Sequence, residues 1–145
     1  MGEFKMTRRE LREQTFKMLF GAGFHEADDK EEALSNYLDE TYEYEIEYFE
    51  KKKIIERVLE IDKLVPVLDE KIDSVAEGWK TARMGKAELN IIRLALYEML
   101  NDETVPVRVA INEAIELSKE YGGDDAPAFV NGILAKLVVK EGLEL

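Results

Sequence analysis

Residues 105–137, with the sequence VPVRVAINEAIELSKEYGGDDAPAFVNGILAKL, indicate two helices joined by a short polar loop. Pro106 stands where the first helix begins, a position at which a missing N–H matters little. Gly122 and Gly123 are expected to end that helix, because glycine readily adopts the left-handed conformation that follows many helices. Asp125 can cap the second helix through its carboxylate. The stretch therefore predicts two consecutive helices near the C-terminus.

Apolar residues recur at helical spacing in both segments, and Pro127 fits the first turn of the second. The first stripe is Val109, Ile111, Ala114, Ile115, Leu117 and Ser118, and the second is Phe129, Val130, Ile133, Leu134 and Leu137. The polar residues close to these stripes are Asn112, Asp124, Asp125 and Asn131. They suit either capping and loop hydrogen bonds or a ligand site at a helix N-terminus.

The same spacing predicts further helices before residue 105. Thr7 and Glu10 have the spacing of a capping box, so the first helix is expected to begin at Thr7. The others are expected after an acidic turn at 28–32, over about 44–61, over about 61–80 and over 87–100. Phe49 and Trp79 are placed on inward faces, and Pro66 marks a helix boundary near 62–65.

The helix over 87–100 is apolar around most of its circumference and is expected at the centre of the C-terminal half. No pattern typical of a β-strand appears. We therefore predict an all-α fold of about seven helices in a single domain, residues 1–145. An N-terminal helical group (about 7–61) is expected to pack on a C-terminal helical bundle (about 62–141).

Composition excludes several classes of protein. The chain has 145 residues and no cysteine, which rules out disulfides and thiolate metal sites. His25 is the only histidine, so a zinc site is not expected. No nucleotide-binding glycine loop, metalloprotease motif or nucleophile elbow is present. We expect no catalytic residue, no metal and no cofactor. The absence of a long apolar run predicts a cytoplasmic protein without a membrane contact.

Charge is distributed unevenly along the chain. The net charge of −12 argues against RNA binding by the whole surface. Residues 1–25 nevertheless hold five basic residues against three acidic ones, whereas residues 26–50 hold eleven acidic residues against Lys30 alone. Any RNA contact is therefore expected to be local and at the basic end. The lysine run at 51–53 ranks lower as a site, because glutamates flank it.

Several motifs resemble one family. The sequences AINEAIELSKEYG (110–122) and FVNGILAK (129–136) occur in order at a short separation. RRELR (8–12), Trp79, and ELNIIRLALYEML (88–100) extend the similarity over nearly the whole chain from Thr7. Together they are similar to the bacterial transcription antitermination factors of the NusB family. The resemblance implies an all-helical fold of two subdomains and binding to the boxA element of nascent ribosomal RNA.

The resemblance also implies partners and site residues. Members of this family bind boxA jointly with NusE, a small-subunit ribosomal protein, within the antitermination complex of RNA polymerase. The residues implied in contact with single-stranded RNA are Arg8, Arg9, Arg12, Phe20, Asp125, Phe129 and Asn131. Contact with NusE is implied around Glu88 and on the accessible face of the 87–100 helix. Proteins bind single-stranded RNA with basic side chains along the RNA backbone and with aromatic rings that stack on the bases.

Two other interpretations stay open at this point. The chain can be a free-standing relative of the RNA-binding domain that precedes the catalytic domain of ribosomal RNA cytosine methyltransferases. Alternatively, it is a protein-binding adaptor without direct RNA contact, with its acidic segment as the interface. Salt-dependent RNA binding distinguishes an RNA-binding factor from such an adaptor.

Overall fold

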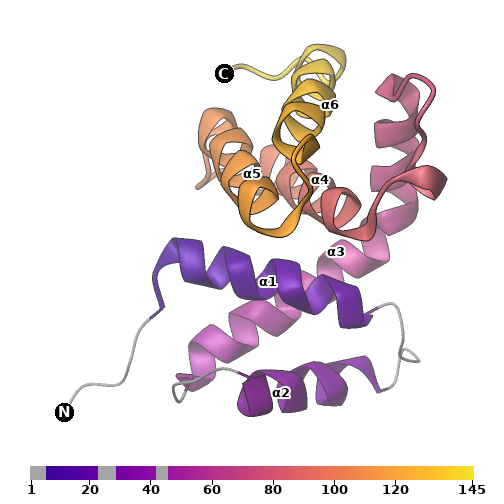
Figure 1. Ribbon diagram of the computed structural model, residues 1–145. Coiled ribbons are helices and arrows are strands. Elements are labelled where there is room, and N and C mark those ends of the chain that lie inside the picture. Colours follow the sequence, from indigo (N-terminus) through magenta and orange to yellow (C-terminus); the bar gives the residue numbers. More distant parts are fainter. Residues whose placement is uncertain (1–5, 23–28, 42–45) are drawn as a thin grey trace. The chain divides into compact units, whose positions relative to one another are not determined.

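The computed structural model describes residues 6–22, 29–41 and 46–145, and every regular element in these ranges is helical. The elements are α1 (Arg8–Ala22), α2 (Lys30–Thr41), α3 (Tyr48–Val75), a short 3-10 turn η1 (Thr81–Arg83), α4 (Lys86–Asn101), α5 (Val107–Tyr121) and α6 (Ala126–Lys140) (Figure 1). The predicted all-α class is confirmed. The described residues hold six α-helices, where about seven were expected.

The difference in number arises at Pro66. The helices expected over about 44–61 and 61–80 are one helix, α3, and the expected break near 62–65 is wrong. Pro66 lies inside α3 and is exposed, so water can reach the backbone carbonyl that proline leaves without a partner. Ile61 and Leu68, on either side of Pro66, are buried, and their packing stabilises the helical turns that flank the proline.

The chain divides into two compact units, Met1–Lys63 and Leu64–Leu145, and the boundary falls inside α3. In the first unit α1 packs against α2. Its largest fully buried side chains are Phe16, Met18, Leu38, Ile54 and Ile61. The capping box at the start of α1 is present, since Thr7 N–H donates to Glu10 Oε1 and Glu10 N–H donates to Thr7 Oγ1, both at 3.1 Å.

In the second unit α4, α5 and α6 pack against one another. Every residue of α4 from Leu89 to Met99 is buried except Arg93, which confirms the expected central helix. Arg93 pairs with Asp69 of α3, with its Nη2 at 2.6 Å from Oδ2 and its Nε at 2.8 Å from Oδ1. In α5 the predicted residues Ile111, Ala114, Leu117 and Ser118 are buried. At the start of the stripe Ala110 is buried in place of Val109, which is 41% exposed, and Ile115 is half-buried.

Two aromatic residues predicted to point inward are exposed instead. Phe49, in the first turn of α3, is 67% exposed, and Trp79 is 51% exposed. Trp79 lies beyond α3, which ends at Val75, in a turn where Gly78 has a positive φ of 71°. The Asp73 carboxylate holds this turn by accepting hydrogen bonds from Thr81 N–H at 2.7 Å and Thr81 Oγ1 at 3.0 Å. The inward stripe of the helix therefore stops before it reaches Trp79.

Candidate nucleic-acid interface

The start of α1 carries the predicted arginines in a fixed position. Arg8 and Arg9 are exposed and Arg12 is half-buried, in the first two turns of the helix. The capping box fixes where the helix begins, and the Met6 N–H just before it donates to the Glu50 carboxylate of α3 at 3.1 and 3.2 Å. Because these bonds anchor the backbone, the arginines project from a defined helix start.

Phe20 lies near the other end of α1. It is half-buried, and its ring makes an edge-to-face contact with Phe16, with centroids 5.3 Å apart and planes at 79°. Phe16 is 1% exposed and belongs to the core. The two residues are four positions apart, so their rings meet on one face of the helix. One of the rings is buried and the other is accessible. Phe20 is the ring of this pair that a base can reach.

The start of α6 differs from the sequence expectation in one respect. Asp125 occupies the N-cap position and is exposed, but its side chain makes no capping hydrogen bond. Ala126 N–H donates to Gly123 O at 3.0 Å, and Pro127 has no N–H to offer. These features leave few backbone donors for a phosphate at this helix end. The Asp125 carboxylate is instead available as an acceptor for donors such as base amino groups.

Phe129 and Asn131 follow in the first turns of α6. Phe129 is half-buried and Asn131 is exposed. The inward face of the helix is already filled by other residues: Val130, Ile133, Leu134 and Leu137. Gly132, three residues after Phe129, has open space around the position of a Cβ atom. Residue 132 therefore contributes no side chain that could cover the Phe129 ring.

Gly122 lies between the end of α5 and the start of α6, and a glycine is needed there for steric reasons. Its φ of −100° and ψ of 177° are extended, so the expected left-handed conformation is wrong. A Cβ atom at this position would meet the Ala126 side chain and would lie 2.8 Å from Ser118 O and 3.2 Å from Glu88 Oε1. Close packing of α5, α6 and α4 therefore requires a residue without a side chain at 122.

This packing brings Glu88 to the start of α6. Glu88 is half-buried in the first turn of α4, and its carboxylate lies against Gly122, three residues before Asp125. The predicted protein-contact residue and the predicted RNA-contact residues of α6 thus occupy one end of the second unit. Arg8, Arg9, Arg12 and Phe20 belong to the first unit. Within each unit, the predicted site residues lie on one helix or at one helix junction.

Replacing Gly122 with alanine should lower the free energy of unfolding by about 1–3 kcal/mol, because the new methyl group overpacks against Ser118 O and Ala126. Urea denaturation followed by circular dichroism measures the change. Gly123→Ala is the matched control, since nothing lies within 4 Å of a Cβ atom there. Equal stability of the two variants would show that the junction is loosely packed.

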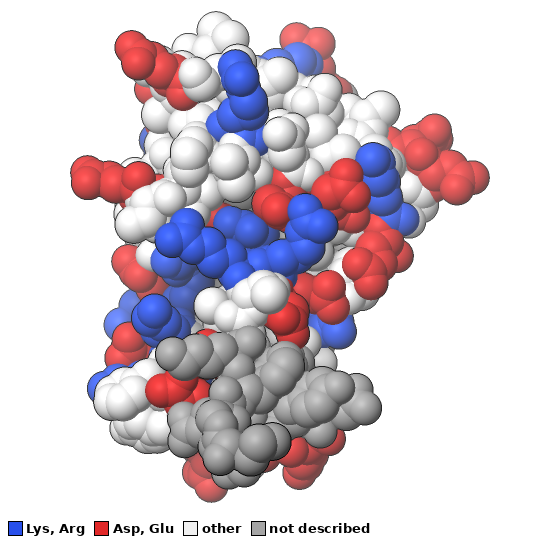
Figure 2. All heavy atoms as spheres, turned by 90° about the vertical axis from the view of Figure 1, so that its left-hand side faces the viewer, with Lys and Arg blue, Asp and Glu red and all other residues white. Residues whose placement is uncertain are grey.

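Two lysines of the run at 51–53 have acidic partners in the structure. Lys51 pairs with Asp39 at 2.8 Å, and Lys52 lies 4.0 Å from Glu56. Such pairs leave less positive potential for phosphate. Figure 2 shows that the face drawn there carries acidic and basic side chains together, with basic groups gathered in one place. A net charge of −12 is therefore compatible with a local basic surface.

The part of the chain that the structure describes offers neither a candidate metal site nor a helix that could span a membrane. No cluster of acidic or histidine side chains there could hold a metal ion, and His25 lies outside the described residues. Among the described helices, none has the length and apolar character needed to cross a membrane.

Comparison with known proteins identifies the family of this chain. The sequence profile of the NusB family matches residues 9–139. The chain belongs to the NusB family. The transcription antitermination protein NusB of Lachnoclostridium phytofermentans is 49% identical over 140 residues, which cover 92% of this chain and 99% of that protein. The NusB protein of Agathobacter rectalis is 46% identical, over 90% of this chain and 98% of that protein.

The fold agrees with this assignment. A solved structure of T. maritima NusB in a P3121 crystal form superposes with a TM-score of 0.80 at 34% identity and covers 94% of each chain. NusB proteins are transcription antitermination factors and are not enzymes, as the motifs predicted. Membership in the NusB family implies RNA and the transcription machinery as partners.

The sequence did not reveal how the candidate site residues are held. The steric role of Gly122 and the position of Glu88 beside it depend on contacts between helices that are far apart in sequence. The only signal of it in the sequence is the pair of glycines at 122–123, which predicts no more than the end of a helix.

Proposed function

We propose that this chain acts in transcription antitermination by binding the boxA element of nascent ribosomal RNA together with NusE. The carrying observation is that a NusB-family chain presents a half-buried ring, Phe129, and the exposed polar residues Asp125 and Asn131 at the start of one helix. Nascent ribosomal transcripts are made in the bacterial cytoplasm, so the proposal places the chain there. Both units act as one RNA-binding domain in this proposal.

In the proposed complex the start of α6 reads bases. A ring such as Phe129 can stack on one base, and stacking is tolerant of base identity. Asp125 accepts hydrogen bonds from base amino groups, and the Asn131 amide both donates and accepts. Pro127 and the bonded Ala126 N–H disfavour a phosphate at this position. Selectivity among RNA sequences therefore arises from α6.

The start of α1 supplies the charge that RNA requires. Arg8, Arg9 and Arg12 lie in its first two turns and contact backbone phosphates in the proposed complex. Guanidinium groups suit this role because their planar set of donors matches phosphate oxygens. Phe20 offers a second accessible ring on the same helix. The α1 contacts add affinity that is independent of RNA sequence.

NusE is proposed to contact the chain around Glu88. Most of α4 is buried, which leaves its first turn as the accessible part near this residue. Because the Glu88 carboxylate lies beside the loop that leads into α6, a protein bound there also borders the proposed RNA site. Joint binding of RNA and NusE follows from that proximity.

Replacing Arg8 with alanine should weaken the binding of all single-stranded RNAs to a similar extent, because phosphate contacts carry no sequence information. The slope of log K against log salt concentration should fall by about 0.7 for one phosphate contact. Fluorescence anisotropy at several salt concentrations measures it. Arg8 is preferable to Arg9 and Arg12, which already interact with other groups.

Lys53→Ala is the matched control for this experiment, since Lys53 is exposed on α3 in the same unit. It should leave the salt slope unchanged. If Lys53→Ala lowers the slope and Arg8→Ala does not, the phosphate contacts belong to the lysine run. If wild-type protein shows no RNA binding with or without NusE, the protein-binding adaptor is the better interpretation.

A further inference from the structure

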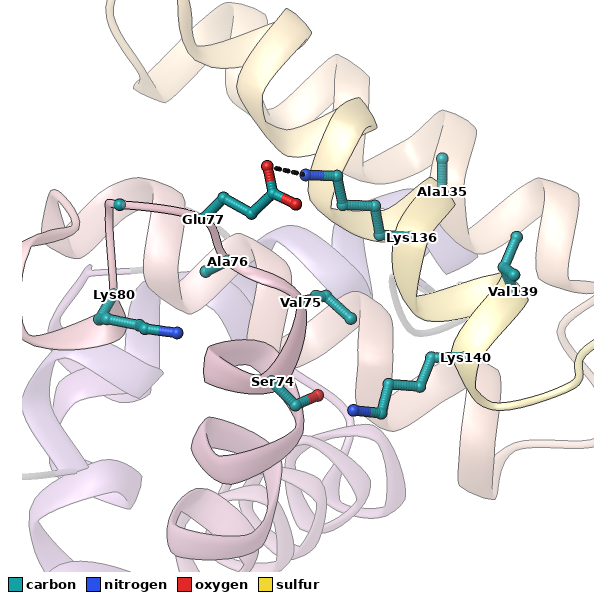
Figure 3. Close-up of a pocket in the computed structure, with 10 residues that line it drawn as sticks. Ser74, Val75, Ala76, Glu77, Lys80, Ala135, Lys136, Val139 and Lys140 are labelled. Carbon is teal, nitrogen blue, oxygen red and sulfur yellow. Dashed lines mark ion pairs between the residues drawn. The ribbon is translucent and has the colours of Figure 1, made fainter.

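A shallow groove of about 860 Å³ lies between α6 and the end of α3 with the turn that follows it (Figure 3). Its floor is aliphatic, and we call Val75, Ala76, Ala135 and Val139 the groove floor. Its edges carry Lys80, Lys136 and Lys140, which we call the rim lysines. All of these residues belong to the second unit, and none has been assigned to RNA or NusE above.

Two large apolar side chains at and beside the groove, Val139 and Trp79, are exposed. Val139 is 81% exposed although it lies on α6, whose inward face is buried. Trp79 is not itself a lining residue, but it lies between the lining residues Gly78 and Lys80 in the sequence and is 51% exposed. Large exposed side chains of this kind, rimmed by charge, are typical of protein contact surfaces. Tryptophan in particular often contributes much of the binding energy at such surfaces.

The rim lysines give the groove a local positive charge on an acidic protein. Glu77 is the one acidic residue among the described lining residues, and its carboxylate lies 3.9 Å from Lys136 Nζ. That pair is solvent-exposed and is therefore weak and easily exchanged. Lys80 Nζ donates at 2.7 Å to the Asp73 carbonyl, which is a neutral acceptor. Lys140 has no hydrogen-bond or ion-pair partner among the described residues.

We propose that the groove is a docking site for an acidic amphipathic segment of a protein partner. The apolar side chains of that segment pack on the groove floor and Trp79, and its carboxylates pair with the rim lysines. RNA fits less well, because the described lining residues carry no amide to read bases and no ring, so that Trp79 beside them is a single ring for stacking. The proposal does not depend on RNA binding at α1 and α6.

The single tryptophan of the chain makes this docking directly observable. The probe is a synthetic 18-residue helical peptide without aromatic residues, with leucines on one face and glutamates on the other. Titration into the full chain should change Trp79 fluorescence saturably. The same peptide with lysines in place of glutamates should produce no saturable change, because the rim lysines repel it. A general attraction to this chain would instead favour the lysine peptide, since the net charge is −12.

Two variants test the groove itself. Lys136→Gln combined with Lys140→Gln removes two exposed charges and should raise the Kd for the acidic peptide roughly tenfold, as expected for two surface ion pairs. Val139→Ala removes exposed apolar surface and should also raise it. The matched control combines Lys63→Gln with Lys119→Gln, two exposed lysines outside the groove, and should change the Kd less than about twofold.

Three results would overturn the proposal. One is an absence of saturable change with the acidic peptide. Another is an equal loss of affinity in the control variant, which would assign the effect to total charge. The third is a change in Trp79 fluorescence with oligouridylate that depends on Lys136 and Lys140, which would make the groove an RNA site.

Discussion

Replacing Phe16 with alanine is expected to lower the free energy of unfolding by about 3–5 kcal/mol, because a fully buried ring leaves a cavity that the core cannot fill. Phe16 is 1% exposed in α1 and is among the largest buried side chains of the first unit. Urea denaturation followed by circular dichroism measures the loss.

Phe20→Ala is the matched comparison, since it removes the partly accessible ring of the same pair. It should destabilise the fold less than Phe16→Ala and weaken RNA binding where the variant is still folded. A larger loss of stability for Phe20→Ala than for Phe16→Ala would contradict the assignment of the two rings.

Replacing Phe129 with alanine is expected to weaken RNA binding by about 1–3 kcal/mol through the loss of one stacked base. Its effect on stability should be small by comparison with the 3–5 kcal/mol typical of buried phenylalanines. The ring is half-buried, and its neighbours on α6 already fill the inward face. An RNA titration and a thermal melt on the same variant measure both quantities.

Phe129→Tyr serves as the control, because it keeps an aromatic face and should retain most of the RNA affinity. A large fall in melting temperature for Phe129→Ala, with normal RNA affinity, would make Phe129 a core residue and would rule out stacking.

Local signals in the sequence predicted local structure well. The spacing of Thr7 and Glu10 predicted the capping box that begins α1, and the all-round apolar pattern at 87–100 predicted the buried α4. Pro106 and Pro127 stand where the starts of α5 and α6 were expected. Each of these features depends on residues within a few positions of one another, which is why a pattern could reveal them.

Tertiary contacts explain the predictions that were wrong. Pro66 was expected to break a helix, yet α3 continues because buried residues on both sides hold it and solvent reaches its exposed face. Gly122 was expected to adopt a left-handed conformation, yet its role is to leave room for Ala126 and Glu88. Trp79 was expected inside and lies in a turn. None of these outcomes is visible in the spacing of neighbouring residues.

The family resemblance names candidate site residues but says nothing of how they are arranged in space. The motifs at 110–122 and 129–136 indicated the family, and the family profile confirms it. That Glu88 lies against the loop before α6, and that the Asp125 side chain is not used as a cap, became apparent only from the packed helices. These two facts link the proposed NusE contact to the proposed base contacts.

The most direct measurement is the equilibrium binding of two labelled RNAs of equal length and composition, one carrying boxA and one scrambled, with and without NusE at one fixed salt concentration. The proposed function predicts tighter binding of the boxA RNA, and a further gain for that RNA alone when NusE is present. A tenfold gain corresponds to about 1.4 kcal/mol. Equal affinity for the two RNAs in the presence of NusE would contradict it.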